Sequence, residues 1–155
     1  MLWTASSALA GDPSATLLIV ETTAGDPPVE FLGDTADIVY FISMAHSERY
    51  GADHPLARAS SIIKRKLRIP IGPLMNFGDA NAETSEERAL LEKLWQDAAP
   101  LAEAAVKAAE AIESEPDLQE LTSAFPELVD RLRELSAMAA WATERDAKVR
   151  LTYVL

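Results

Sequence analysis

The stretch that decides the fold is TSEERALLEKLWQDAAPLAEAAVKAAEAIE, residues 84–113. Thr84 stands three residues before Glu87, which is the capping-box signature of a helix start, and no glycine follows in the rest of the chain. Because the apolar spacing continues across Pro100, the stretch predicts one continuous helix with a kink at the proline. The seam residues are spaced alternately 3 and 4 positions apart: Leu91, Leu94, Ala98, Leu101, Ala105, Ala108 and Ile112.

A second apolar seam follows after a short connection. Residues 113–117 predict the connection, residues 118–125 suit one short helical turn, and Pro126 suits the first position of a further helix. Two seams joined in this way predict an antiparallel helical hairpin over residues 84–143. The second seam repeats the spacing of the first: Leu128, Leu132, Leu135, Ala139 and Ala142.

Two more helices are expected before the hairpin, within residues 34–68. Asp34 is a suitable N-cap and Gly51 suits the end of a helix, so the strongly apolar stretch between them predicts a helix packed on several sides. A buried strand is the alternative for that stretch. Asp53 suits the cap of the next helix, which is amphipathic and basic and ends before Pro70.

The remaining segments are irregular or β-prone. Residues 1–33 are irregular overall, but 15–23 is rich in β-branched residues between turn formers and predicts a strand, and 29–32 suits a second. Residues 69–83 form an apolar loop whose prolines exclude a helix. Residues 148–155 alternate with period two, so they either pair with the first strand or extend the preceding helix.

Length and composition fit one folded domain, residues 1–155. Hydrophobic residues make up 48% of the chain and charged residues 25%, which excludes an intrinsically disordered protein. The predicted fold class is mainly α, a helical bundle built on the antiparallel hairpin. A small β element comes from the N-terminal third and, in one of the two alternatives above, from the C-terminus.

Cysteine content and the length of the apolar runs narrow the class of protein. Without cysteine the chain has no disulfide framework, thiolate zinc site or catalytic thiol. Its apolar runs are far shorter than the roughly 20 residues that span a bilayer, and the first residues lack the features of a signal peptide. We therefore expect a cytoplasmic protein without a membrane segment.

Charge is segregated along the sequence. The formal net charge of −11 disfavours nucleic acid and anionic lipid as partners. Residues 54–78 nevertheless contain no acidic residue and carry a basic island of charge +5: Arg58, Lys64, Arg65, Lys66 and Arg68. The island either docks on residues 79–120, which carry twelve acidic and three basic residues and thus a net charge of −9, or binds an anionic ligand or partner. We favour the first role.

His46, Glu48 and His54 are the candidates for a polar site. Metal binding needs ligands that converge, but His46 and Glu48 are two positions apart and do not share a helical face. The sequence contains no third histidine. We therefore expect no metal site.

Residues 45–51, AHSERYG, resemble over seven residues the phosphorylated-histidine motif of histidine phosphotransfer domains. The sequence departs from that motif because Tyr50 separates the basic Arg49 from Gly51. The resemblance implies a phosphotransfer role for His46, supported by nearby carboxylates.

No catalytic or phosphate-binding motif stands out. The sequence has no Gly-rich phosphate loop, no G-x-S-x-G and no H-E-x-x-H. We therefore expect a non-catalytic helical interaction or regulatory module that needs no cofactor and binds a protein partner or a second copy of itself as a homo-oligomer. The alternative is an enzyme or a histidine phosphotransfer-like protein that uses His46.

Overall fold

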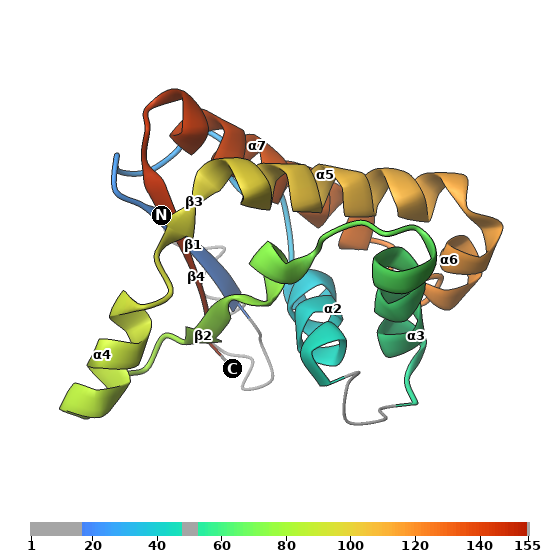
Figure 1. Ribbon diagram of the computed structural model, residues 1–155, viewed down its shortest axis with the longest axis horizontal. Coiled ribbons are helices and arrows are strands. Elements are labelled where there is room, and N and C mark those ends of the chain that lie inside the picture. Colours follow the sequence, from blue (N-terminus) through green and yellow to red (C-terminus); the bar gives the residue numbers. More distant parts are fainter. Residues whose placement is uncertain (1–16, 48–52, 155) are drawn as a thin grey trace.

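The computed structural model describes residues 17–47 and 53–154, which are mostly helical with one small sheet (Figure 1). The mainly α class with a small β element is confirmed. None of the helices in these two ranges is long and apolar enough to cross a membrane. The elements, in chain order, are β1 (Leu17–Thr22), α2 (Ala36–Ser47), α3 (Pro55–Ser61), β2 (Phe77–Asp79), α4 (Ser85–Glu92), β3 (Gln96–Asp97), α5 (Ala98–Ser114), α6 (Pro116–Leu121), α7 (Leu128–Glu144) and β4 (Lys148–Val154).

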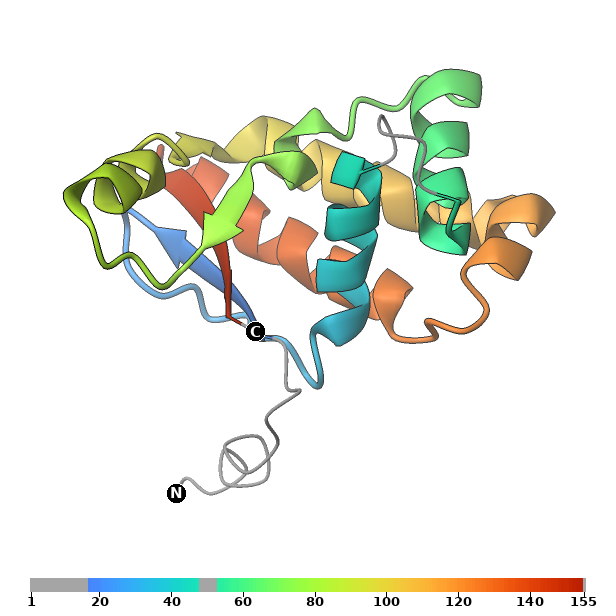
Figure 2. The same cartoon turned by 90° about the horizontal axis from the view of Figure 1, so that it is seen from below.

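The helices α5 and α7 lie side by side along the long axis of the molecule (Figures 1 and 2). The Ser136 hydroxyl of α7 donates a hydrogen bond of 2.8 Å to the carbonyl of Ala102 in α5. Farther along the pair, Arg133 forms an ion pair with Glu113. Small side chains along both helices allow their axes to approach closely. The α7 residues of the second seam are all fully buried: Leu128, Leu132, Leu135, Ala139 and Ala142.

The first seam does not form one helix, so the prediction of a single continuous helix is wrong, although α5 itself runs across Pro100. Five residues separate the end of α4 from the start of α5, and they include β3. Pro100 falls in the first turn of α5, where its missing N–H needs no partner. The Gln96 side chain fixes this connection by donating to the carbonyl of Pro73 at 3.0 Å. Leu91 and Leu94 are thereby separated from the buried row of α5.

β4 lies at the centre of the sheet, because the other three strands all pair with it. β1 runs antiparallel to it, from Leu17 opposite Val154 to Thr22 opposite Val149. β2 pairs with β4 in parallel, and β3 pairs with its first two residues in antiparallel orientation. The strand predicted within residues 15–23 is confirmed, and the C-terminal segment pairs with it rather than extending the preceding helix.

Two of the irregular segments differ from the prediction. Residues 29–32 form no strand, because the Leu32 N–H donates to Glu134 of α7 (3.4 Å) instead of to a neighbouring strand. The loop expected at residues 69–83 is more ordered than predicted. It contains a short 3-10 turn at Gly72–Met75 as well as β2, because a proline suits the start of such a turn and Leu74 is buried within it.

α2 is a helix at the centre of the core, so the alternative of a buried strand is wrong. The helix begins one residue later than predicted, since the carbonyl of Thr35 accepts the first helical hydrogen bond. The Asp34 carboxylate accepts from the N–H of Ala36 at 2.6 Å. The end predicted at Tyr50 and Gly51 lies outside the described residues. Five side chains of α2 are buried: Ile38, Val39, Phe41, Ile42 and Ala45.

The cap of α3 is His54, so the prediction that Asp53 caps this helix is wrong. Pro55 is the first helical residue, which makes the residue before it the N-cap. Nδ1 of His54 accepts a hydrogen bond of 3.1 Å from the N–H of Leu56. The Asp53 carboxylate instead forms an ion pair of 2.5 Å with Arg58.

Arg131 is a buried cation that ties α7 to the segment before α2. Its guanidinium pairs with Glu134 at 2.6 Å and with Glu127 at 3.4 Å, and its side chain is only 5% exposed. The Glu134 carboxylate also accepts from the N–H of Leu32, and the N–H of Glu127 donates to Asp37 at 3.0 Å. This network joins residues 32–37 to α7, and its two contacts span 102 and 90 residues of the chain.

Candidate functional site

α4 projects from one end of the molecule (Figures 1 and 2) and buries none of its residues. A capping box determines the residue at which α4 begins. The Thr84 hydroxyl accepts from the N–H of Glu87 at 3.1 Å, and the Glu87 carboxylate accepts from the N–H of Thr84 at 3.0 Å. α4 is therefore defined by local hydrogen bonds rather than by packing into the core.

The capping box lowers the pKa of Glu87 below the ordinary value of a glutamate, chiefly because the N–H of Thr84 donates to the carboxylate, and further because the N–H of Glu83 does. A depressed folded-state pKa means that ionised Glu87 favours the folded α4 above its ordinary pKa. This contribution is lost as the pH falls through the folded-state pKa. We expect an NMR titration of the Glu87 carboxyl carbon to give a midpoint below the ordinary value.

Glu87→Gln is the matched control for this titration, because glutamine keeps the capping-box geometry but does not titrate. In this variant the amide signal of Thr84 is expected to lose most of its dependence on acidic pH. An ordinary midpoint for Glu87 in the unmodified chain would mean that the capping box does not form in solution.

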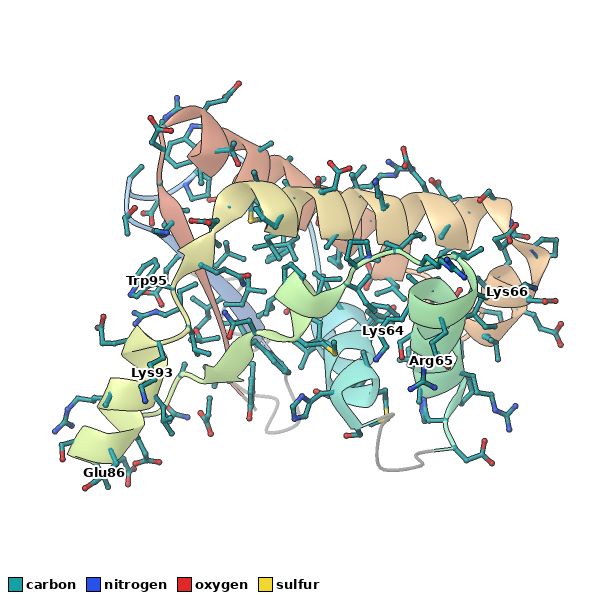
Figure 3. All side chains as sticks on the ribbon, viewed as in Figure 1. Lys64, Arg65, Lys66, Glu86, Lys93 and Trp95 are labelled. Atoms are coloured by element: carbon teal, nitrogen blue, oxygen red, sulfur yellow. The ribbon has the colours of Figure 1, made fainter. Side chains whose placement is uncertain are left out.

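Arg150 holds the C-terminal end of α4 against the sheet. Its guanidinium donates to the carbonyl of Leu91 at 3.4 Å and lies 3.8 Å from the carboxylate of Glu92. The same guanidinium lies 4.5 Å from the centroid of the Trp95 ring, which is near the α4 end of the molecule in Figure 3. It also donates two hydrogen bonds of 3.1 Å to the carboxylate of Glu21 on β1. Since Arg150 is on the central strand, it links the orientation of α4 to the sheet.

A groove of about 380 Å³ lies between α4 and β2. Its apolar walls include Leu90 and Leu91 of α4 and Phe77 of β2. Leu90 is 61% exposed, so its side chain is open to solvent at the groove. A Cβ atom at Gly78 would lie 3.0 Å from the Leu94 side chain. The glycine therefore allows Leu94 to pack closely against β2.

The rim of the groove is acidic. Residues 79–93 carry five acidic and two basic side chains, a net charge of −3, and every one of these seven residues is exposed. Asp79 and Glu87 line the groove itself, as does Lys93. The site therefore combines an apolar interior with a negatively charged border.

The predicted basic island lies away from this groove, toward the other end of the long axis (Figure 3). Lys64, Arg65 and Lys66 fall in a π-helical turn, Ile62–Lys66, that continues α3. Arg68 follows in the left-handed backbone region with φ of 56°. The structure thus keeps these four cations together within one turn and its exit.

The surroundings of the island bear on the two roles predicted for it. Arg58 pairs with Asp53, both being exposed, and the Arg65 guanidinium donates to the Ser61 hydroxyl at 3.3 Å. Leu67 and Ile69 line a surface hollow together with acidic residues of the α5 end, Glu110 and Glu115. Carboxylates of residues 79–120 therefore lie beside the segment, and docking of the island on them stays a prediction.

The two histidines of the predicted polar site lie on different elements, His46 in α2 and His54 at the start of α3, and the polar site stays a prediction. His46 is exposed in the last turn of α2, and Glu48 lies outside the described residues. His54 caps α3 and packs its ring 5.9 Å from the ring of Phe125. Over residues 17–47 and 53–154, no group of three or more histidine, cysteine, aspartate or glutamate side chains could hold a metal ion. The phosphotransfer role of His46 stays a prediction.

Sequence reasoning missed the groove because it placed Leu91 and Leu94 in the core of a continuous helix. Leu90 and Phe77 are residues of ordinary type without a motif around them. The useful signal was the segment Trp95 to Asp97, which stands between the leucines and the alanine-rich stretch that begins at Ala98.

Scans against protein-family models, curated proteins and solved structures each gave no match.

Proposed function

We propose that this chain is a non-catalytic interaction module that binds a partner protein in the groove between α4 and β2. In this proposal the antiparallel hairpin of α5 and α7 is the rigid body that carries the binding element. The single observation that carries the proposal is that α4, a capped helix whose two leucines both line the groove, contributes no buried residue to the core. Its leucines are available to contact another protein.

The dimensions of the groove support this role. A volume of about 380 Å³ is at the lower end of the range for protein binding pockets, and it accommodates one or two aliphatic side chains. Protein interfaces concentrate their binding energy in a few anchors that enter such apolar hollows, with a charged or polar rim around them. Leu90 and Phe77 provide the hollow, and the exposed carboxylates provide the rim.

The apolar wall of the groove indicates the shape of the partner. Leu90 and Leu91 of α4 and Leu94, which follows the helix, all line the groove. An apolar groove beside a helix is the kind of surface that receives the apolar face of an amphipathic helix. The segment expected in the groove is therefore an amphipathic helix with aliphatic anchors.

A fluorescent amphipathic peptide tests this function. The peptide carries leucines spaced alternately 3 and 4 residues apart, and its control carries serine at the same positions. We expect Leu90→Asp to weaken binding of the leucine peptide by at least about tenfold, as for a central interface anchor. Because Leu90 is exposed, the free energy of unfolding is expected to change by less than about 0.5 kcal/mol.

Ala137→Asp is the matched control, because it adds the same charge at an exposed position of α7. This variant is expected to bind the peptide like the unmodified chain. Fluorescence anisotropy gives the affinities and denaturant melts give the stabilities. Equal binding of the leucine and serine peptides would contradict the proposed function.

A further inference from the structure

Four carboxylates at or near the groove form no ion pair within the described residues. Within the two described ranges, no lysine, arginine or histidine lies within ion-pair distance of Asp79, Glu83, Glu86 or Glu87. Hydrogen bonds inside the chain engage two of them: Asp79 accepts from the N–H of Asn81 at 2.9 Å, and Glu87 accepts in the capping box. Arg88 acts on the charge of Glu87 and Lys93 lines the groove, but residues 79–93 keep a net charge of −3.

The charge of the whole chain acts in the same direction as the rim. A net charge of −11 attracts cations over long distances and repels other anionic surfaces, including a second copy of this chain. Attraction of this kind raises the rate at which a complementary partner associates and suppresses partners of like charge. Both the local and the overall charge therefore favour a positively charged occupant.

The chain's own basic island is too distant to fill this groove. α4 stands at one end of the long axis, and the turn with Lys64, Arg65 and Lys66 lies toward the other end (Figure 3). The island of a second copy would have to approach against the repulsion between two chains of charge −11. A different protein is therefore the better match.

From these observations we infer that the partner segment is a basic amphipathic helix of another protein, with aliphatic anchors for the groove and lysine or arginine side chains for its acidic rim. This inference rests on the proposed function and names the chemistry of the partner. The aliphatic anchors contact Leu90 and Phe77. The cations meet Asp79, which lines the groove, and Glu86, which is exposed in the first turn of α4.

Two peptides that differ only in charge test the inference on the full chain. Both carry the same leucines, and their polar positions are all lysine in one and all glutamate in the other. We expect the lysine peptide to bind at least about tenfold more tightly at low salt, a difference of about 1.4 kcal/mol. The ratio is expected to fall as salt is raised, because the Debye length shortens from about 10 Å at 0.1 M to about 3 Å at 1 M.

Charge-reversal variants locate the effect. Asp79→Lys and Glu86→Lys are each expected to reduce the ratio of the two peptide affinities by several fold. Glu120→Lys is the matched control, because it makes the same change in net charge on α6 at the far end of the molecule. This variant is expected to narrow the difference much less, since screening limits the effect of a distant charge.

The outcomes separate the inference from the proposed function. Equal affinity for the two leucine peptides, or tighter binding of the glutamate peptide, would overturn the inference and leave the function standing. Failure of both leucine peptides to bind more tightly than their serine controls would overturn both. If the chain self-associates without peptide, and Lys66→Glu or Leu90→Asp abolishes that association, the occupant is a second copy and the inference is wrong.

Discussion

Replacing Arg131 with alanine is expected to lower the free energy of unfolding by about 3 kcal/mol, because it leaves a carboxylate that is largely excluded from water without its cation. Glu134 is 14% exposed and loses its ion pair of 2.6 Å, and Glu127 loses a second contact. The connection between α7 and the segment before α2 weakens at the same time. Denaturant unfolding at neutral pH measures the change.

Arg133→Ala is the control for this prediction, since it removes an arginine–glutamate pair two positions away on the same helix. That arginine side chain is 42% exposed, and exposed pairs contribute about 0–1 kcal/mol. Arg131→Met separates charge from packing, because methionine retains the length of the side chain without its charge. Equal losses for Arg131→Ala and Arg133→Ala, or full stability of Arg131→Met, would contradict the importance of the buried charge.

Replacing Phe41 with alanine is expected to lower the free energy of unfolding by about 3–5 kcal/mol, because it removes a fully buried aromatic ring from the centre of the core. α2 contacts α3, α7 and β1, so the resulting cavity adjoins several elements at once. Neighbouring side chains can then relax only partly into the space. Thermal and denaturant unfolding both report the change.

The neighbouring residue provides the control for Phe41. Tyr40 is 44% exposed on the same helix, and Tyr40→Ala removes a ring of similar size from a position in contact with water. We expect a much smaller loss, of about 1 kcal/mol or less. Similar losses for the two variants would mean that the orientation of α2 differs from the one described.

The sequence predicted those parts of the fold that depend on local periodicity. Every residue of the second seam is buried, because the spacing of leucine and alanine in α7 defines one face of one helix. The prediction of one helix from the first seam failed because the spacing of apolar residues alone does not distinguish a continuous helix from two helices in phase. The deciding interaction is the pairing of β3 with β4, and the two lie about 50 residues apart along the chain.

Predictions that required a choice between adjacent residues succeeded less well. Asp53 and His54 can both cap a helix, and the choice depended on the register that Pro55 imposes. The candidate groove could not be predicted from the sequence, for a related reason. Phe77 and Leu90 come from different elements, and neither residue has a chemistry that marks it as functional when read along the sequence.

The position of β4 has a consequence for synthesis of the chain on the ribosome. β4 is made after the other three strands, yet all of them pair with it. Thr23 and Lys148, which are hydrogen-bonded at the end of the β1–β4 pair, are 125 residues apart. At roughly 5–20 residues per second, β1 waits roughly 6–25 seconds for its partner. During this interval its edge is open to other nascent chains, so slow translation of the α5 and α7 region would favour aggregation over folding.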